Sequence, residues 1–297
     1  MLQEFNPANK DLKVYIDGEM LHRDAAKISV FDSAVQGGDA VWEGIRVYNG
    51  RVFSLDQHLD RLFDSAHAML FKGIPSREEV RTAIFKTLRA NNMRDGVHIR
   101  LTLTRGIKIT SGMDPRLNQA GCSLIVLAEY KPPVYPPSIK LATSSVRRNS
   151  PMSIDSKIHH NNLINNILAK IEANNAGAHA GLMLDKDGFV SEANGVNVFT
   201  IRRGTVYTPH ADYCLPGITR ATVLQICADN NIPAREKRLS LTEFYTADEV
   251  FTTGTMGELT RVDSIDDRKI INKHGTSVLD RLNGLFAELT RTQGVEF

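Results

Sequence analysis

Short apolar runs separated by turn dipeptides dominate the N-terminal half of the chain. The runs around Asp17-Gly18 and around Asn49-Gly50 have this form. Because Asp-Gly and Asn-Gly tolerate the positive φ of a tight turn, each dipeptide predicts a β-hairpin. Two later runs rich in apolar and β-branched residues, 97–104 and 122–130, predict further strands.

Start signals predict two helices between these strands. Ser54 with Gln57, and Ser76 with Glu79, have the spacing of a capping box, in which a serine and a Glu or Gln satisfy each other's backbone N–H groups. Strands and helices therefore mix without a fixed order, as in an α+β domain.

The C-terminal half has the same mixture, without the regular βαβ alternation of a doubly wound sheet. Its glycines mark hairpin turns and helix ends. The predicted elements are a helix over 161–176 that ends at Gly177, hairpins at Asp187-Gly188 and Arg203-Gly204, a helix from near Gly217, and a last helix over 277–291.

A proline-rich segment, 131–137, divides the two halves. Four of its seven residues are proline, which fixes φ and removes backbone donors, so helix and central strand are both excluded. We therefore expect a small α+β domain over 1–130, a linker over 131–137 and a larger α+β domain over 138–297. Two domains also agree with a length of 297 residues.

Composition excludes several classes of protein. The 36 basic residues nearly balance the 34 acidic ones, so there is no overall basic excess for nucleic-acid binding. No stretch approaches the roughly 18 apolar residues of a membrane span, and the N-terminus lacks the basic start and apolar run of a signal peptide. We expect a cytoplasmic protein that contacts neither membrane nor nucleic acid.

Cysteine and histidine spacing argues against metal. The three cysteines lack CxxC spacing, which disfavours a zinc site or a disulfide scaffold. The pair His159-His160 points in different directions on a helix and has no further ligand at a useful spacing. We expect no metal site and interpret the pair as a polar lining or a surface position.

Two glycine-containing loops are candidate anion sites. Leu215-Pro216-Gly217 leads into a helix whose first N–H groups lack intrahelical partners, and Thr219 adds a hydroxyl. The loop 254–258, with the sequence GTMGE, permits a close backbone approach. A plain helix entry and a plain β-turn would look the same locally. The motifs GxGxxG, GxxxxGK[ST], GxSxG and HExxH are absent.

Ordered blocks along nearly the whole chain then carry a family resemblance. They are VYIDGEM, VWEGIRVYNGRVFSLDQHLDRL, SKIHHNNLINNILAKIEA, GFVSEANGVNVFTI, LPGITR and ADEVFTTGTMGELTRV. With these blocks the chain resembles the class IV, or fold-type IV, pyridoxal-phosphate aminotransferases, which include branched-chain and D-amino-acid aminotransferases. The resemblance implies a two-domain α+β fold with the cofactor between the domains, and a homodimer.

The resemblance also implies roles for individual residues. Lys157 matches the lysine that forms the Schiff base with pyridoxal 5′-phosphate and then moves a proton. Glu192 matches the carboxylate that pairs with the pyridine nitrogen and favours the protonated, electron-accepting ring. The residues that match phosphate-binding positions are Arg61, Ile218, Thr219 and Thr255. Without the family, Lys157, Glu192 and Arg61 would each be interpreted as an ordinary surface charge.

Four residues are expected in the substrate pocket: Trp42, His98, Arg100 and Met256. Strand alternation puts His98, Arg100 and Thr102 on one face. If that face looks into the pocket, Arg100 is the candidate partner of the α-carboxylate. The alternative for Arg100 is an exposed strand arginine or an interface salt bridge. For Trp42, plain core packing is an equal alternative.

The substrate class stays open between related reactions. Asn162, Gly37 and His98 stand where branched-chain enzymes use tyrosines, whereas EGIR and LPGITR follow the branched-chain pattern. QGGDAVWE and the Thr-Arg-Gly at 104–106 look similar to the D-amino-acid branch. The resemblance favours transamination of a branched-chain L-amino acid with an acceptor such as 2-oxoglutarate. The alternatives are a D-amino-acid or (R)-amine transaminase, an aminodeoxychorismate-type lyase and a noncatalytic binder.

Overall fold

The computed structural model describes residues 3–297, which form two compact units. The N-terminal unit comprises 3–132, 158–162 and 290–297, and the C-terminal unit comprises 133–157 and 163–289. The chain passes between them at Pro132–Pro133, inside the predicted linker. Unlike the boundaries expected from the linker alone, two short segments beyond it, 158–162 and 290–297, belong to the N-terminal unit.

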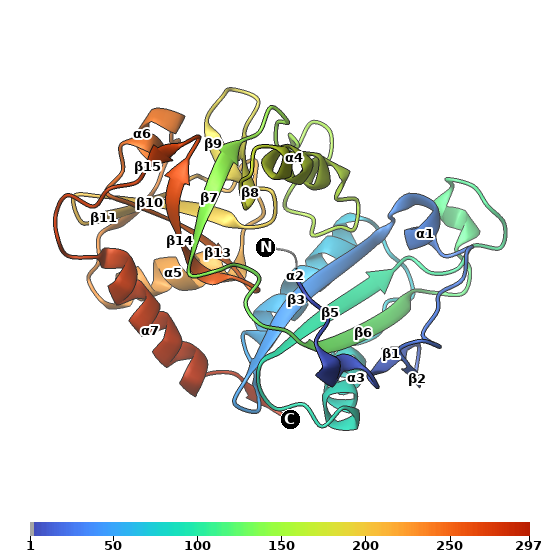
Figure 1. Cartoon of the computed structure of the whole chain (residues 1–297). Coiled ribbons are helices and arrows are strands. Elements are labelled where there is room, and N and C mark those ends of the chain that lie inside the picture. Colours follow the sequence, from blue (N-terminus) through green and yellow to red (C-terminus); the bar gives the residue numbers. More distant parts are fainter. Residues whose placement is uncertain (1–2) are drawn as a thin grey trace. The chain divides into compact units, whose positions relative to one another are not determined.

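The N-terminal unit is built on a seven-stranded antiparallel sheet in the order β16-β4-β3-β5-β6-β1-β2, counted over the described residues (Figure 1). Its strands are β1 Lys13–Ile16, β2 Glu19–His22, β3 Ala40–Tyr48, β4 Arg51–Val52, β5 Val97–Thr104, β6 Ser123–Tyr130 and β16 Val295–Glu296. Its helices are α1 Ser33–Gly37, α2 Leu55–Ala68 and α3 Arg77–Ala90, with short 3-10 helices at Pro7–Asn9 and Pro115–Leu117.

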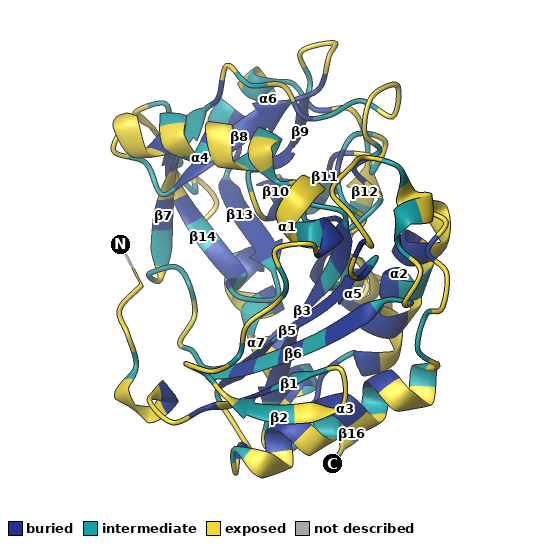
Figure 2. Cartoon of the chain, turned by 90° about the vertical axis from the view of Figure 1, so that its right-hand side faces the viewer, coloured by how far each residue is buried: buried dark blue, intermediate teal, exposed yellow. Residues whose placement is uncertain are grey.

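Strand alternation determines which face of this sheet is the core. Alternate positions of β3 and β5, among them Val41, Ile45 and Ile99, are fully buried and pack in one hydrophobic cluster with Leu59 of α2 and Ile84 of α3. Both helices therefore cover the same face of the sheet, since each buries one apolar stripe. Figure 2 shows the buried strands in dark blue.

Local turn signals predicted this unit well, with one exception. The hairpins at Asp17-Gly18 and Asn49-Gly50 are confirmed, and so is the capping box of Ser76 with Glu79. The capping box predicted at Ser54 is wrong. Ser54 has φ +50°, and its side chain makes no capping bond to α2. A capping side chain needs an extended backbone, and here the sharp entry from β4 imposes a left-handed one.

The C-terminal unit contains a nine-stranded mixed sheet in the order β12-β11-β10-β13-β14-β7-β8-β9, with β15 paired to β14, again counted within 3–297. Its strands are β7 Ser138–Thr143, β8 Ala180–Leu184, β9 Val190–Ala193, β10 Asn197–Arg202, β11 Thr205–Thr208, β12 Ala234–Glu236, β13 Glu249–Gly254, β14 Glu258–Ile265 and β15 Arg268–Lys269. Its helices are α4 Ile164–Asn175, α5 Ile218–Asp229, α6 Leu241–Tyr245 and α7 Val278–Thr292, whose last turn groups with the N-terminal unit.

Neighbouring strands β10 and β13 place apolar side chains on both faces of this sheet. Phe199 and Phe251 stack on one face with ring centroids 4.8 Å apart. Val198 and Val250 lie on the other, in a cluster that includes Phe244 of α6. Burial on both faces explains why each strand carries adjacent apolar residues, Val-Phe, rather than a strict alternation.

Most elements predicted for this unit are confirmed. The hairpins at Asp187-Gly188 and Arg203-Gly204 join β8 to β9 and β10 to β11. Gly217 is the residue that precedes α5. The helix predicted from residue 161 begins at Ile164, because the preceding residues bond to β3 around an isolated bridge between His160 and Val41.

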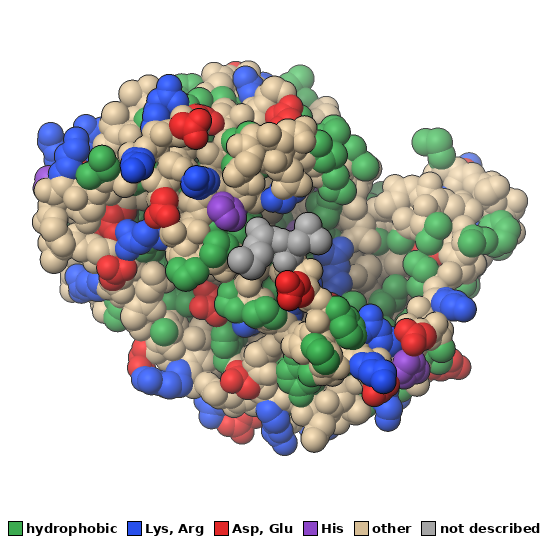
Figure 3. Space-filling view, in the orientation of Figure 1, with side chains coloured by type: hydrophobic (Ala, Val, Ile, Leu, Met, Phe, Trp, Pro, Cys, Tyr) green, Lys and Arg blue, Asp and Glu red, His purple; other side chains and the backbone are tan. Residues whose placement is uncertain are grey.

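Two properties of the described surface bear on partners. No helix within residues 3–297 combines the length and apolar character that crossing a membrane requires. Basic and acidic side chains are interspersed over the face in Figure 3, in keeping with a formal net charge of +2.

Candidate active site

Lys157 is the last residue of the C-terminal unit before the chain enters the N-terminal unit. Its Nζ lies 3.4 Å from the carbonyl oxygen of Asp212 and 3.7 Å from a carboxylate oxygen of Asp155. The side chain is 47% exposed. Lys157 thus has an accessible amine that lies beside the main chain of Asp212.

Glu192 lies on β9 and is buried. One carboxylate oxygen accepts from Arg148 Nε at 2.6 Å and from the Leu215 N–H at 3.4 Å, and the other accepts from Asn197 Nδ2 at 3.1 Å. Burial raises the pKa of Glu192, and the Arg148 guanidinium opposes that rise. Glu192 is therefore no surface charge but a buried carboxylate fixed by three donors.

The start of α5 packs against the same asparagine. Asn197 Nδ2 also donates to the Leu215 carbonyl at 2.9 Å, and Asn197 Oδ1 lies 2.1 Å from where a β-carbon on Gly217 would be. A side chain at Gly217 would therefore have to displace Asn197. The first N–H groups of a helix have no intrahelical acceptor, so those of Ile218 and Thr219 are available for an anion.

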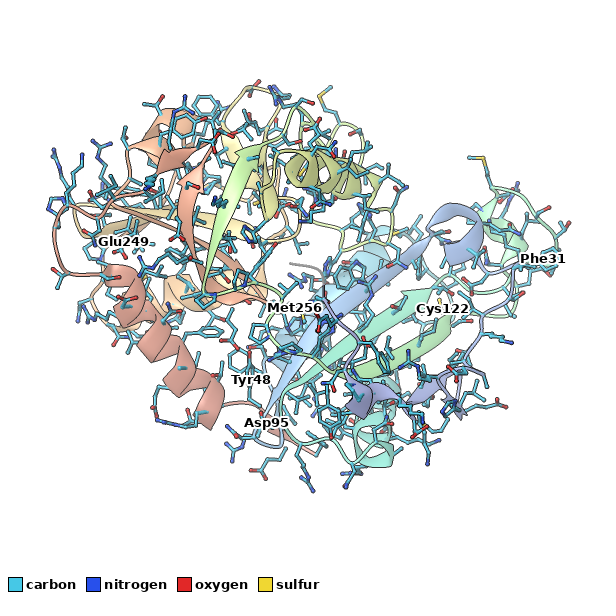
Figure 4. The ribbon with its side chains drawn as sticks, in the orientation of Figure 1. Phe31, Tyr48, Asp95, Cys122, Glu249 and Met256 are labelled. Carbon is cyan, nitrogen blue, oxygen red and sulfur yellow. The ribbon has the colours of Figure 1, made fainter. Side chains whose placement is uncertain are left out.

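The second predicted anion loop, between β13 and β14, packs against the turn that joins β9 to β10. A β-carbon on Gly254 would lie 2.9 Å from Val196 Cγ1. Met256, labelled in Figure 4, lies at the tip of the loop, and its carbonyl accepts from the Val134 N–H at 3.0 Å. Thr255 is half-buried, and the buried Oγ1 of Thr253 has no hydrogen-bond partner among the described residues.

One short segment thus connects the predicted groups of the C-terminal unit. Ser191 Oγ donates to the Tyr213 carbonyl at 3.0 Å, so β9 holds the segment 212–219 near its start as well as at Leu215. Lys157 contacts this segment at Asp212, and the segment ends in the first turn of α5. The structure therefore brings Lys157, Glu192 and the α5 start together.

In the N-terminal unit, Arg61 is bound by a carboxylate. Its Nε and Nη2 donate to the two oxygens of Glu43 at 2.8 and 2.7 Å, and its side chain is 14% exposed. The Nε–Nη2 edge of the guanidinium is therefore engaged inside the protein.

The predicted substrate residues of β3 and β5 lie on the face of the sheet opposite Glu43. The Arg100 guanidinium carbon lies 3.4 Å from the centroid of the Trp42 ring, and Nη2 donates to Asn161 Oδ1 at 2.8 Å. Burial lowers the pKa of Arg100 to about 10 and that of His98 to about 3, which leaves His98 neutral. A β-carbon on Gly44 would lie 3.0 Å from His98 Nε2, so these side chains pack closely.

Two other side chains lie at the surface. Phe31, labelled in Figure 4, is 44% exposed. The Arg116 side chain is 89% exposed and paired with Asp114.

A family comparison decides the class of the protein. The sequence model of the family described as amino-transferase class IV matches residues 40–265, about three quarters of the chain. The chain belongs to the class IV aminotransferases.

Relatives from distant organisms agree with this membership. The branched-chain-amino-acid aminotransferase-like protein 1 of Arabidopsis thaliana is 57% identical over 291 residues, which are 97% of this chain and 52% of that protein. This chain thus spans about half the length of that relative. A putative branched-chain-amino-acid aminotransferase of Methanocaldococcus jannaschii is 37% identical over 286 residues, 96% of this chain and 99% of that protein.

A solved class IV structure confirms the fold. The branched-chain amino acid aminotransferase of Escherichia coli is 30% identical and matches with a TM-score of 0.89 over 96% of this chain and 97% of that chain. The predicted α+β fold of fold-type IV is therefore correct for this chain.

Sequence reasoning missed the residues that hold the class IV positions in place, above all Glu43, Asn197 and Arg148. Glu43 gave a usable signal, because in AVWEGIRVY it alternates with Val41 and Ile45 and so falls on the buried face of the strand. Asn197 gave none, since its partner Gly217 is distant in sequence. Of the two interpretations of His159, the surface position is wrong, because its side chain is only 13% exposed and its Nδ1 is bonded to Glu43.

Proposed function

We propose that this class IV aminotransferase transfers an amino group between a branched-chain L-amino acid and a 2-oxo acid such as 2-oxoglutarate, with pyridoxal 5′-phosphate as cofactor. One observation carries the proposal. Asn197 binds both the Glu192 carboxylate and the Leu215 carbonyl, and its Oδ1 occupies the space beside Gly217. A buried carboxylate and a helix start are thereby held as one group, next to an accessible amine.

The residues present suit the cofactor chemically. Gly217 leaves the α5 N–H groups open to a phosphate. Thr253, whose buried Oγ1 has no hydrogen-bond partner among the described residues, is the cross-strand partner of Asn197. Glu192 offers a carboxylate for a ring nitrogen, and Lys157 offers an amine. When bound, pyridoxal phosphate supplies the electron-accepting ring that makes Cα–H cleavage possible.

The protein's own groups then have distinct tasks. Lys157 Nζ would be the amine that holds the cofactor, and the same amine could serve as the base for the Cα proton. Glu192, bonded to Arg148 and Asn197, would offer its carboxylate to the ring nitrogen of the cofactor. The class IV resemblance assigns the phosphate to Ile218, Thr219, Thr255 and Arg61.

Arg100 is proposed to bind the substrate α-carboxylate, with Trp42, His98 and Met256 beside the substrate. Stacking on Trp42 and the bond to Asn161 hold the guanidinium in one orientation, which favours selective recognition of a planar carboxylate. The branched-chain assignment of the substrate rests on the names of the relatives. The family resemblance also leads us to propose a homodimer.

Borohydride trapping tests the cofactor assignment directly. Reduction of the cofactor-loaded protein, followed by digestion and mass spectrometry, is expected to give a phosphopyridoxyl adduct on Lys157. The absence of an adduct there would exclude the assigned lysine. A panel of L- and D-amino acids and (R)- and (S)-amines, with 2-oxoglutarate or pyruvate as acceptor, then separates the branched-chain assignment from the D-amino-acid and amine alternatives. Release of pyruvate from aminodeoxychorismate would instead identify a lyase.

A further inference from the structure

The residues that follow Lys157 form a strap, defined here as residues 158–162, along the edge of β3. The Trp42 N–H donates to the His159 carbonyl at 2.9 Å, and the Asn161 N–H donates to the Ala40 carbonyl at 2.8 Å. The strap thus joins the sheet through an isolated antiparallel bridge between His160 and Val41. Its main chain has little freedom to move.

Within the strap, His159 is anchored through both its main chain and its ring. Besides accepting from Trp42, its backbone donates to Ser65 Oγ at 3.1 Å. Its ring lies against the Trp42 ring with centroids 4.1 Å apart, and its Nδ1 lies 3.1 Å from Glu43 Oε1. Because a carboxylate oxygen can only accept, Nδ1 is the donor in this bond. His159 therefore fixes the main chain two residues after Lys157.

Glu43 connects His159 to the arginine assigned to the phosphate. Its side chain is fully buried, and each oxygen receives two donors. Oε1 accepts from Arg61 Nε and His159, whereas Oε2 accepts from Arg61 Nη2 at 2.7 Å and from His58 Nδ1 at 2.6 Å. We call these four residues the Glu43 cluster. Any displacement of the carboxylate moves Arg61 and His159 together.

The charges of the Glu43 cluster are balanced without a further ion. The carboxylate carries one negative charge and Arg61 one positive charge. Burial lowers the pKa of both histidines, so each stays a neutral donor at pH 7. Among the described residues, no group of three or more His, Cys, Asp or Glu is arranged to hold a metal ion. The cluster is thus a closed hydrogen-bonded support.

We propose that His159 is a positioning residue for transamination and that Glu43 is the carboxylate that holds His159 and Arg61 in one fixed relation. The strap fixes the backbone that follows Lys157, and Glu43 fixes the orientation of the Arg61 guanidinium. This inference rests on the proposed function, because it gives the cluster a purpose only if Lys157 and Arg61 bind one cofactor.

The test compares two replacements of His159 in the cofactor-loaded protein. His159→Asn keeps an N–H donor near the position of Nδ1, whereas His159→Leu keeps the volume and removes the donor. The matched control is His67→Leu, an exposed histidine near the end of α2. The measurements are the pH midpoint of the visible absorbance of the lysine-bound cofactor, the cofactor dissociation constant and the kcat and KM of the half-reaction.

We expect His159→Leu to shift the spectral midpoint by about one pH unit. Movement of the backbone at residue 159 would displace Lys157 and so change the charges around its Nζ, the nitrogen that joins it to the cofactor. We expect its cofactor dissociation constant to rise roughly five- to tenfold, since loss of one donor reorients Glu43 and with it Arg61. The kcat should fall more than KM changes. His159→Asn should restore the midpoint and the affinity to near the wild-type values, and His67→Leu should leave both unchanged.

Glu43→Gln tests the shared carboxylate. The amide presents a donor where Glu43 had an acceptor, so we expect a shift of the midpoint in the same direction as for His159→Leu. Adding His159→Leu to Glu43→Gln should then have little further effect, because both changes act through one support. Circular dichroism and thermal melting show whether each variant is folded, and the pair of His159 variants suffices if Glu43→Gln does not fold.

The outcomes separate the two levels of the proposal. If wild-type protein gives no borohydride adduct on Lys157, the proposed function fails. If wild-type protein is trapped on Lys157 but His159→Leu has the midpoint and cofactor affinity of His67→Leu, the proposed function stands and this inference is overturned. A His159→Asn variant as impaired as His159→Leu would also overturn it, because the donor would then be irrelevant.

Discussion

Asn197 Oδ1 lies 2.1 Å from the point that a β-carbon on Gly217 would occupy. The amide nitrogen of the same side chain holds Glu192 at 3.1 Å. One asparagine therefore sets the start of α5 and the orientation of the buried carboxylate, so a change at Gly217 is transmitted to both.

Gly217→Ala should damage cofactor binding through this contact. The added methyl group must displace Asn197, which we expect to cost about 1–3 kcal/mol of unfolding free energy and to weaken cofactor binding about tenfold. Gly195→Ala is the matched control, because a β-carbon there has nothing within 4 Å. Urea unfolding and apoenzyme titration measure the two effects. Equal behaviour of the two alanine variants would contradict the role given to the contact.

Lys157→Ala should abolish turnover and borohydride trapping while the protein stays folded. The side chain is about half exposed and makes only long contacts, so the unfolding free energy should change by less than about 0.5 kcal/mol. Lys186→Ala, at another exposed lysine, controls for loss of a surface charge. A Lys157→Ala variant with more than about one per cent of wild-type rate, without added amine, would remove the assigned nucleophile.

Arg61→Ala should weaken cofactor binding and also destabilise the fold. Loss of a charge-assisted phosphate contact corresponds to about 1.5–3 kcal/mol, or roughly ten- to a hundredfold in affinity. Removing Arg61 also leaves the buried Glu43 carboxylate without its paired cation, which we expect to cost about 3 kcal/mol or more of stability. Arg77→Ala, an exposed arginine of α3 paired with Asp60, is the control. Unchanged cofactor affinity in folded Arg61→Ala protein would assign the phosphate elsewhere.

Arg100→Leu should distinguish substrates with and without a carboxylate. If Arg100 binds the α-carboxylate, amino acids should lose about 2–4 kcal/mol in kcat/KM, because a largely desolvated charged contact is lost. Simple amines should lose much less. Steady-state kinetics on matched amino-acid and amine substrates give the comparison. Equal losses would make Arg100 a structural residue that only supports Trp42 and Asn161.

Acid should destabilise the fold through the buried histidines. Burial lowers the pKa of His159 from 6.5 to about 4, so between these values the unfolded chain binds the proton and the folded chain does not. Stability contributed by neutral His159 is thus fully present above pH 6.5 and is lost as the pH falls towards 4, at up to about 1.4 kcal/mol per pH unit. Melting temperatures across this range should fall less steeply for His159→Asn than for wild type. Parallel curves would show that His159 does not titrate in this way.

Much of the local structure was predictable because its causes are local. Asp17-Gly18 forms a hairpin and Ser76 forms a capping box, since each needs only residues a few positions apart. Ser54 shows the limit of such signals, because the entry from β4 overrides its capping spacing. From the sequence, residues 161 and 162 are predicted to start a helix, but they belong to the strap. The bond of Asn161 to β3 joins residues more than a hundred positions apart, so no local signal predicts it.

The candidate site divides in the same way. Lys157 and Glu192 could be named only through the family resemblance, since each alone is an ordinary charged residue. The supports of the site were not predictable from spacing. Glu43 and His159 are separated by 116 positions and Asn197 and Gly217 by 20, and only the folded chain brings either pair together.

The strap has a consequence for how the protein can be divided. Because residues 158–162 and 290–297 belong to the N-terminal unit, the described polypeptide crosses from one unit to the other four times. Cleavage at Pro132–Pro133 would therefore not release two modules. A fragment that stops at Pro132 would lack an edge segment beside β3 as well as β16, and its remainder would carry those segments without their partners. We therefore expect neither half of the chain to fold when it is expressed without the other.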